Sequence, residues 1–280
     1  MADKSVYIKD LKKLNWKIEK FRKSGKNFLH VVSDFDKTLT KAFVEGQKIQ
    51  SSYEHLRKRG YLTSDYAQRS YDLKKIYYPF EISKDISAEE KHQKMREWWA
   101  KHYDLMVECG LSIKDINSVI EDVVPRDGMN ELFGMLNNFS IPFLIFSSGM
   151  GDLIREYLSH ENLMTDNVHL ISNFFRFDKD GRAVGYNKPL IHVFNKSEIE
   201  LKNYQYHKEI QDRKNVILLG DSLGDLGMTE GIKHDCIIRI GFLNENADDM
   251  LEKYSEEFDV VILNDGSMEY VIEILRTIVS

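Results

Sequence analysis

The chain has little cysteine and no long apolar run, and both shortages narrow the classes of protein to which it belongs. Only two of its 280 residues are cysteines, Cys109 and Cys236, and they lie far apart without metal-ligand spacing. Neither a disulfide framework nor a zinc site is therefore expected. No run of about 18 apolar residues occurs, and the lysine-rich residues 1–26 contain no apolar core of signal-peptide length. We expect a cytoplasmic protein without a membrane span.

Positive charge is also in short supply. Lys and Arg number 39 against 45 Asp and Glu, which gives a formal net charge of −6. This balance argues against the broad basic face that binds nucleic acid, although it leaves room for a local positive pocket for a small anion. Apolar residues make up 42% of the chain and charged residues 30%, as in ordinary globular proteins. The length suits one large domain or two modest ones.

Strand and helix patterns alternate over most of the chain. Apolar strand patterns occur at 28–33, 142–146, 168–172, 215–219, 236–240 and 260–263. Helical spacing of apolar residues occurs at 5–24, 127–138, 150–160, 196–211, 223–231, 245–255 and 267–279. This alternation predicts an α/β fold with a mostly parallel sheet covered on both faces. The turn sequence Asp178–Gly181 predicts that a small hairpin within 173–187 interrupts the rhythm.

One block departs from this alternation. From about residue 51 to 122 no strand pattern is visible, and helical patterns occur at 51–60, 64–77, 88–108 and 112–121. The block falls between the first and second strands of the sheet, so both its ends leave the same sheet edge. We predict a core of residues 1–48 and 124–280 and a helical cap of residues 49–123 placed as a lid over that edge.

Two carboxylates follow the first strand of the predicted sheet. Asp34 and Asp36 are spaced i, i+2, so both side chains can face one reaction centre. Two carboxylates in one place repel each other, and a bound cation relieves that repulsion. The pair suits one acid as nucleophile and metal ligand and the other as proton carrier. An isolated Asp-x-Asp is more often a polar turn, so the interpretation depends on the rest of the chain.

Three later segments carry groups suited to a phosphate or a divalent ion. Ser147 and Ser148 begin a Gly-rich turn between an apolar strand and a helix, where exposed N–H groups favour an anion. Lys196 is a cation able to neutralise phosphate oxygens. Asp221 and Asp225 follow another apolar strand, and carboxylate oxygens suit Mg²⁺. Open α/β sheets bind ligands at the carboxyl ends of their strands, so we expect these groups to meet there.

The order and spacing of these residues resemble the haloacid dehalogenase superfamily of phosphohydrolases, and more closely the cytosolic 5′-nucleotidase III family. The superfamily's four motifs match residues 34–38, Ser147, Lys196 and residues 220–225. The nucleotidase family is matched further by residues 147–152, 171–174, 177–178, 190–196, 218–225, 241–244 and 251–254. The resemblance covers about residues 28–275. It implies a Rossmann-like core with an inserted helical cap of the superfamily's first cap type, Mg²⁺ as cofactor and a small nucleoside monophosphate as substrate. We expect a monomer.

The resemblance also implies a role for each core residue. Asp34 is the expected nucleophile, which becomes an aspartyl-phosphate, and Asp36 is the expected acid and base. Mg²⁺ is expected between Asp34, the Asp36 backbone carbonyl and Asp221. Phosphate-binding and supporting roles fall on the remaining motif residues: Ser147, Ser148, Lys196, Thr38 and Asp225, the last orienting Lys196 or a metal-bound water.

The cap is expected to meet the nucleobase. Glu81 matches the family's base-contacting glutamate, and Trp98, Trp99 and His102 lie in a segment that matches a cap helix near the base. Adjacent helix positions cannot both face one ligand, so at most one tryptophan is expected to stack on the base, and packing inside the cap is the alternative for both. His102 stands where the family often has serine, which alters the hydrogen bonding expected there.

The expected reaction is hydrolysis of pyrimidine nucleoside 5′-monophosphates, UMP or CMP, to nucleoside and phosphate. A 7-methylguanosine monophosphate nucleotidase of the same family is the first alternative, and the paired tryptophans resemble those members slightly. A capped phosphatase for another small ester, such as phosphoserine, shares every core motif. Phosphotransfer to a nucleoside hydroxyl can accompany hydrolysis. The alternative outside the enzymes is a protein that keeps the fold and binds nucleotide without turnover.

Overall fold

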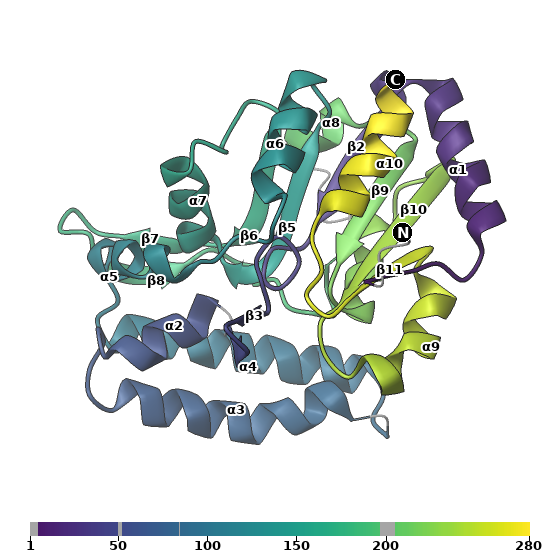
Figure 1. Ribbon diagram of the computed structural model, residues 1–280. Helices are drawn as coiled ribbons and strands as arrows, with labels where there is room; N and C mark the ends of the chain where they lie inside the picture. The colour runs from purple at the N-terminus through teal and green to yellow at the C-terminus, as the bar shows by residue number, and fades with distance from the viewer. Residues whose placement is uncertain (1–4, 50–51, 84, 197–204) are drawn as a thin grey trace.

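A seven-stranded sheet forms the centre of the computed structural model, which describes residues 5–49, 52–83, 85–196 and 205–280 (Figure 1). The strand order is β1-β11-β10-β9-β2-β5-β6. The strands are β1 (Val6–Tyr7), β2 (Leu29–Ser33), β5 (Phe143–Met150), β6 (Val168–Asn173), β9 (Asn215–Gly220), β10 (Cys236–Leu243) and β11 (Val260–Leu263). Every neighbouring pair is parallel except β1 with β11. The expected mostly parallel sheet is confirmed.

Strand β2 is an interior strand of this sheet, between β9 and β5, and is buried on both faces. Val31 packs in a cluster with residues of α1 (Leu11–Ser24), α6 (Met129–Asn138), α7 (Gly151–His160) and α10 (Glu269–Val279). Val32 points to the opposite face, where the cluster includes Tyr206 of α8 (Gln205–Glu209). Helix α9 (Ala247–Glu257) packs on β10 and β11. Because β2 pairs with both β9 and β5, its carboxyl end lies where the connections diverge, which is where such sheets bind ligands.

The helical block between β2 and β5 lies across the carboxyl edge of the sheet. It contains α2 (Ser52–Arg59), α3 (Tyr66–Ile82), α4 (Ala88–Glu108), α5 (Ile113–Ser118) and a 3₁₀ turn (Ile120–Asp122). Figure 1 shows α2, α3 and α4 as one layer below the sheet. We call α2–α5 the cap helices. No described helix combines the length and the apolar composition that crossing a bilayer requires.

The cap helices share a buried apolar cluster with the core. Tyr103 of α4 stacks on Phe175 at 4.6 Å between ring centroids, and Met150 belongs to the same cluster. Phe175 begins the expected hairpin, which is confirmed as β7 (Phe175–Phe177) and β8 (Ala183–Tyr186). Ala183 donates a backbone hydrogen bond to Leu111 at 2.8 Å. The division into a core of 1–48 and 124–280 and a cap of 49–123 stays a prediction.

Several elements differ from expectation. The helix predicted from residue 5 begins at Leu11, because residues 6–7 join the sheet and the side chain of Asp10 caps the helix. An unexpected hairpin pairs β3 (Phe43–Val44) with β4 (Gln47–Lys48); its turn residues Glu45 and Gly46 both have positive φ, a pattern typical of tight hairpin turns.

The two helices predicted near the site also differ. The helix predicted at 223–231 is a 3₁₀ spiral, Leu223–Thr229. Its glycines disfavour an α-helix and permit close packing, since a Cβ at Gly227 would lie 2.8 Å from the Lys196 carbonyl oxygen. Of the helix predicted at 196–211, residues 197–204 lie outside the described residues, and α8 forms the described part.

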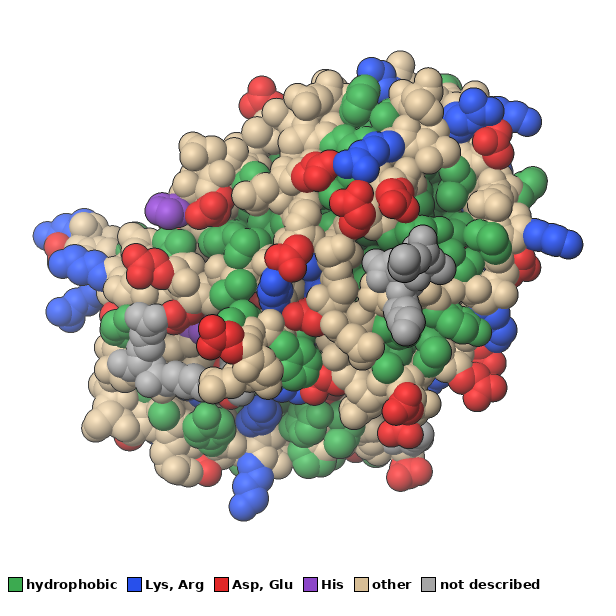
Figure 2. All heavy atoms as spheres, viewed as in Figure 1, with side chains coloured by type: hydrophobic (Ala, Val, Ile, Leu, Met, Phe, Trp, Pro, Cys, Tyr) green, Lys and Arg blue, Asp and Glu red, His purple; other side chains and the backbone are tan. Residues whose placement is uncertain are grey.

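Charged side chains of both signs are interspersed over the face shown in Figure 2, where Lys and Arg do not gather into one continuous stripe. This mixture accords with the small formal net charge of −6.

Candidate active site

Three sequence motifs meet at the carboxyl ends of β2 and β9. Asp34 follows β2 directly and is 6% exposed. The Lys196 ammonium donates hydrogen bonds to Asp34 and to Asp225, the latter at 2.9 Å. Carboxylate oxygens of Asp34, Asp221 and Asp225 all lie within 4.8 Å of one another. The structure therefore brings together acids and an ammonium group that are up to 191 residues apart in the chain, counted as 225 − 34.

Burial and crowding of charge dominate the electrostatics of this cluster. Burial raises the pKa of Asp34 well above its usual value, and the carboxylates of Asp225 and Asp221 raise it further, while Lys196 opposes them. Burial likewise raises the pKa of Asp221, to about 7. Burial alone would lower the pKa of Lys196, but the carboxylates of Asp225 and Asp34 outweigh it and keep the ammonium charged. Two acids that resist ionisation in one place indicate a position for a cation.

The carboxylates differ in how free they are to hold that cation. Asp225 accepts from Lys196 with one oxygen and from the backbone and hydroxyl of Ser222 with the other, at 3.0 and 2.9 Å. A Cβ at Gly220 would lie 2.5 Å from the Asp225 Cβ, so only glycine admits this approach. Among the described residues, none donates a hydrogen bond to the side-chain oxygens of Asp221. Asp221 is therefore the freer ligand, and Asp225 positions Lys196.

The loop of residues 34–40, which we call the nucleophile loop, is braced by a buried arginine. Arg126 is 1% exposed and donates to the backbone carbonyls of Lys37, Thr38 and Thr40. Lys37 has φ of 62°, which a non-glycine residue seldom adopts, and its carbonyl also accepts from Asn244 at 3.0 Å. The Arg126 bonds thus hold a strained turn immediately after the two acids.

The segment of residues 147–149, which we call the phosphate loop, lies at the carboxyl end of β5, on the same edge of the sheet. The pairing of β5 with β6 shifts register there, between Phe146 and Met150. Ser147 is 1% exposed, and its hydroxyl oxygen accepts the Gly149 N–H at 3.0 Å. The Ser148 carbonyl accepts three side-chain donors: Tyr53 at 2.8 Å, Asn173 at 3.0 Å and Trp99 Nε1 at 3.2 Å. Tyr53 and Trp99 come from the cap helices.

A cavity of about 480 Å³ joins these loops to the cap helices. Its lining includes all but one of the site residues predicted from the sequence: Asp34, Asp36, Glu81, Trp98, Trp99, His102, Ser147, Ser148, Lys196, Asp221 and Asp225. The exception is Thr38, which is fully buried and whose hydroxyl has no hydrogen-bond partner among the described residues. Thr38 is part of the nucleophile loop, and its carbonyl accepts from Arg126.

The cap side of the cavity is aromatic and carries two acids, the buried Glu54 and the half-buried Glu81. Burial raises the pKa of Glu81. Trp98 stacks on Tyr77 with centroids 6.1 Å apart, which is the packing alternative weighed for it, and its ring is nearly perpendicular to that of Trp99. Burial lowers the pKa of His102 to about 3, so its ring is neutral at pH 7.

Sequence reasoning missed several residues of this site. Tyr53, Glu54 and Arg57 line the cavity from α2, and no motif marks them in the sequence. Arg126 lies just after the predicted cap boundary at residue 123, and no motif marks it in the sequence. Asn173 falls within the family-like string 171–174, and that resemblance was the available signal for it.

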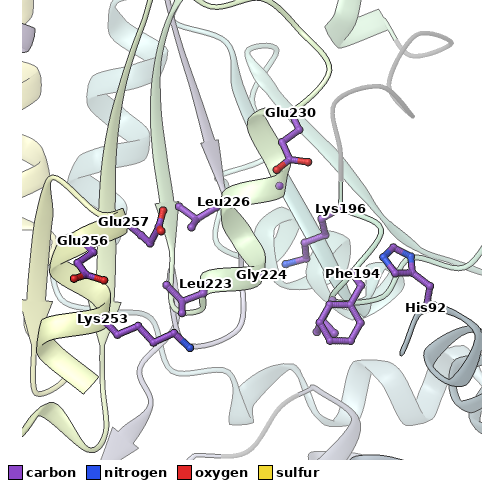
Figure 3. Close-up of a pocket in the computed structure, with 12 residues that line it drawn as sticks. His92, Phe194, Lys196, Leu223, Gly224, Leu226, Glu230, Lys253, Glu256 and Glu257 are labelled. Carbon is purple, nitrogen blue, oxygen red and sulfur yellow. The ribbon is translucent and has the colours of Figure 1, made fainter. Parts of the chain in front are cut away.

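A second cavity, of about 490 Å³, shares only Val193 and Lys196 with the first. Figure 3 shows Lys196 extending toward Gly224, with the ring of His92 from the cap beside Phe194. The His92 and Phe194 ring centroids lie 5.9 Å apart. The lining of this cavity includes none of the clustered aspartates, which all line the first cavity. The contact of His92 with Phe194 joins the cap helices to the segment that carries Lys196.

The comparisons with known proteins agree with this geometry. The family model described as pyrimidine 5′-nucleotidase (UMPH-1) matches residues 37–279, beginning just after the two acids of the first motif. A 7-methylguanosine phosphate-specific 5′-nucleotidase from Gallus gallus is 34% identical over 277 residues, which cover 98% of this chain and 96% of that relative.

Two solved structures extend the comparison to the fold. The structure of cytosolic 5′-nucleotidase IIIB bound to cytidine matches with a TM-score of 0.88 and 30% identity, covering 99% of this chain and 94% of that one. A substrate-bound phosphoserine phosphatase matches with a TM-score of 0.52 and 17% identity, covering 88% of this chain and 96% of that one, which shows a shared fold alone. The expected family resemblance is confirmed: the chain belongs to the pyrimidine 5′-nucleotidase (UMPH-1) family of 5′-nucleotidases, with the haloacid dehalogenase-like α/β fold.

Proposed function

We propose that the protein hydrolyses nucleoside 5′-monophosphates with Mg²⁺ and prefers 7-methylguanosine monophosphate. The observation that carries the proposal is the place of Asp34, which contacts Lys196 beside Asp221 in a cavity whose cap side is aromatic. The name of the Gallus gallus relative supports 7-methylguanosine monophosphate over the pyrimidine nucleotides expected from the sequence.

The proposed roles follow the positions of the side chains. Asp34 attacks phosphorus in line, the bond to the 5′-oxygen breaks, and an aspartyl-phosphate forms. Asp36 protonates the leaving 5′-oxygen and then removes a proton from the water that hydrolyses the aspartyl-phosphate. The Lys196 ammonium, the Ser147 hydroxyl and the N–H groups of the phosphate loop stabilise the charge on the transferring group.

The residues present fit Mg²⁺. Asp34 and Asp221, with the backbone carbonyl of Asp36, would hold the ion, and the clustered ligands of the described residues are carboxylates without His or Cys. When bound, the ion supplies positive charge that stabilises phosphoryl oxygens and favours the ionised forms of both acids. Asp225 is less suited to this role, because Lys196 and Ser222 already engage its oxygens.

The cap side of the cavity suits a flat, positively charged base. Methylation at N7 gives the guanine ring a positive charge, which aromatic faces and a carboxylate attract. Trp99 supplies an aromatic face, and Glu81 supplies a carboxyl group beside it that a cationic base would stabilise in its ionised form. A neutral pyrimidine gains less from these groups.

Pyrimidine monophosphates are the second candidate substrates, because the related cytosolic 5′-nucleotidase IIIB was solved with cytidine bound. Transfer of phosphate to a nucleoside hydroxyl remains a proposed side reaction, since a nucleoside can replace water at the aspartyl-phosphate. Phosphoserine is less well supported, because the phosphoserine phosphatase likeness reaches 17% identity only.

Phosphate release from a substrate panel tests the proposal. The panel contains 7-methyl-GMP, CMP, UMP, AMP and phosphoserine, each assayed with Mg²⁺ and with excess chelator. We expect the highest kcat/KM for 7-methyl-GMP, lower values for CMP and UMP, and loss of all turnover with chelator. Equal rates on phosphoserine and the nucleotides would contradict nucleotide specificity. Full activity with chelator would contradict the Mg²⁺ requirement.

A further inference from the structure

The Ser148 carbonyl is the point at which the cap helices bond to the phosphate loop. It accepts Tyr53 from α2 at 2.8 Å and Trp99 Nε1 from α4 at 3.2 Å, in addition to Asn173 of the core at 3.0 Å. Tyr53 is 9% exposed, so its hydroxyl exchanges these bonds with water only rarely. Few backbone carbonyls accept three side-chain donors, since the oxygen has two lone pairs.

The Ser148–Gly149 peptide carries this constraint to Ser147. A trans peptide directs its N–H opposite to its carbonyl, so fixing the Ser148 oxygen also fixes the Gly149 N–H. That N–H donates to the Ser147 hydroxyl oxygen at 3.0 Å. Because this bond occupies an acceptor position, the Ser147 hydroxyl keeps its own hydrogen for another partner. Among the described residues no protein group accepts it, and Ser147 lines the catalytic cavity.

A second set of contacts holds the next peptide, Gly149–Met150. Tyr103 of α4 lies 2.9 Å from the Tyr53 hydroxyl and 3.4 Å from the Gly149 carbonyl oxygen, and its one hydroxyl hydrogen serves both acceptors. Ser172 of β6 donates to that carbonyl at 3.0 Å. The phosphate loop is therefore held by both the cap helices and the core. The donors from the cap helices are tyrosine hydroxyls and an indole N–H.

We propose that Tyr53 and Trp99 are positioning residues that aim the Ser147 hydroxyl at the substrate phosphate. The proposal rests on the proposed function, because it takes the ligand of Ser147 to be a phosphoryl group. It assigns Trp99 a task that is independent of the nucleobase, since its indole N–H is already bonded to the phosphate loop. The cap helices then complete the phosphate site as well as the base site.

The alternative is that Trp99 acts by stacking on the base. The two roles separate in Trp99→Phe, which keeps an aromatic face and removes the N–H donor. Tyr53→Phe similarly keeps the packing and removes the hydroxyl. Tyr186→Phe is a matched control, because Tyr186 donates to Asp104 at 3.0 Å across the same cap–core boundary and does not touch the phosphate loop.

The experiment compares kcat and KM for 7-methyl-GMP, CMP and the base-free ester ribose 5-phosphate, together with inhibition by orthovanadate. We expect Tyr53→Phe and Trp99→Phe each to lower kcat/KM by about 3- to 10-fold on all three substrates, the usual value of one hydrogen bond. Orthovanadate, which resembles the transferring phosphoryl group, should bind more weakly by a similar factor. Tyr186→Phe should change none of these values.

Two results would overturn the proposal. One is a loss in Trp99→Phe that is confined to the nucleotides, with ribose 5-phosphate and orthovanadate unaffected, because that pattern is base stacking. The other is an equal loss in Tyr186→Phe, because that pattern is general loosening of the cap–core contact. Failure of the proposed function differs from both, since the unmodified enzyme would then release no phosphate from nucleotides. Thermal unfolding of each variant verifies that it is folded.

Discussion

The nucleophile loop and the phosphate loop face one cavity but are held from opposite sides. Arg126 and Asn244, both in the core, hold the nucleophile loop through backbone carbonyls. The phosphate loop receives bonds from the cap residues Tyr53 and Trp99. In the proposed mechanism the attacking group is therefore fixed independently of the cap helices, whereas the proposed phosphate-binding group takes part of its geometry from them. The proposal thus ties phosphate binding to the element that is proposed to contact the base.

The two supports also differ in kind. Arg126 is a fully buried cation that stacks on Phe242 and pairs with Asp265 at 3.1 Å. Asp265 in turn accepts the backbone N–H groups of Ala42 and Phe43, where the chain leaves toward the cap. The phosphate loop is held by neutral donors. Breaking a buried charge pair costs far more than removing one neutral hydrogen bond, so the loops should respond differently to substitution.

The largest expected effect is on turnover. Substitutions in the two loops should lower kcat by different factors, because the loops have different proposed roles. Asp34→Asn should lower kcat by more than about 1000-fold, because it removes the nucleophile. Ser147→Ala removes one donor to the phosphoryl group and should cost about 100-fold. Phosphate release from 7-methyl-GMP measures both. Asp34→Asn should fold normally, since it removes a charge from a crowded cluster. Equal losses in the two variants would contradict the division of roles.

Substitutions in the supports of the two loops should lower the free energy of unfolding by different amounts. Arg126→Met leaves Asp265 buried without its cation, and we expect a loss of about 3–5 kcal/mol in the free energy of unfolding. Tyr53→Phe removes one neutral hydroxyl and should cost about 1 kcal/mol. Urea unfolding at pH 7 measures both, and Arg126→Lys, which keeps the charge with fewer donors, should fall between them. A smaller loss in Arg126→Met than in Tyr53→Phe would invert the comparison.

The sequence predicted the core of this site well because strand ends in a parallel sheet have fixed relations. Once β2, β5 and β9 are recognised as parallel neighbours, Asp34, Ser147 and Asp221 must lie on one edge. The strands themselves are short apolar runs flanked by turns, which makes them visible in one sequence.

The supports of the two loops were not predictable in the same way. Arg126 donates to backbone carbonyls. Every residue has a backbone carbonyl, so the residue types of the loop do not reveal these bonds. Tyr53 reaches Ser148 across a contact between elements that are 95 residues apart, counted as 148 − 53. The 3₁₀ spiral at Leu223–Thr229 differs from the predicted α-helix, although its two glycines are a local signal against that helix. The two loop supports, in contrast, are tertiary interactions that no local pattern encodes.

The last expected effect depends on pH and concerns α7, the helix that follows the phosphate loop. Asp152, in the first turn of α7, accepts the Phe175 N–H at 2.8 Å and so ties that helix to the β7–β8 hairpin. Burial raises the pKa of Asp152 to about 6, against 3.8 when exposed. The folded state therefore holds the proton more tightly, and this contribution to stability, full below the unfolded pKa, declines as pH rises from about 4 through 6.

Asp152→Asn tests this support, because the amide stays neutral at every pH and its oxygen can still accept the Phe175 N–H. We expect the variant to match the original protein near pH 4 and to exceed its unfolding free energy by about 3 kcal/mol at pH 8. Urea unfolding at pH 4.5, 6 and 8 measures the difference. Asp180→Asn, in an exposed turn, is the control, and its difference from the original protein should not change with pH. A difference that grew toward low pH would mean that the ionised carboxylate holds the hairpin. The helix next to the phosphate loop would then be held by a charge, as the nucleophile loop is, and the contrast between neutral and charged supports would be weaker.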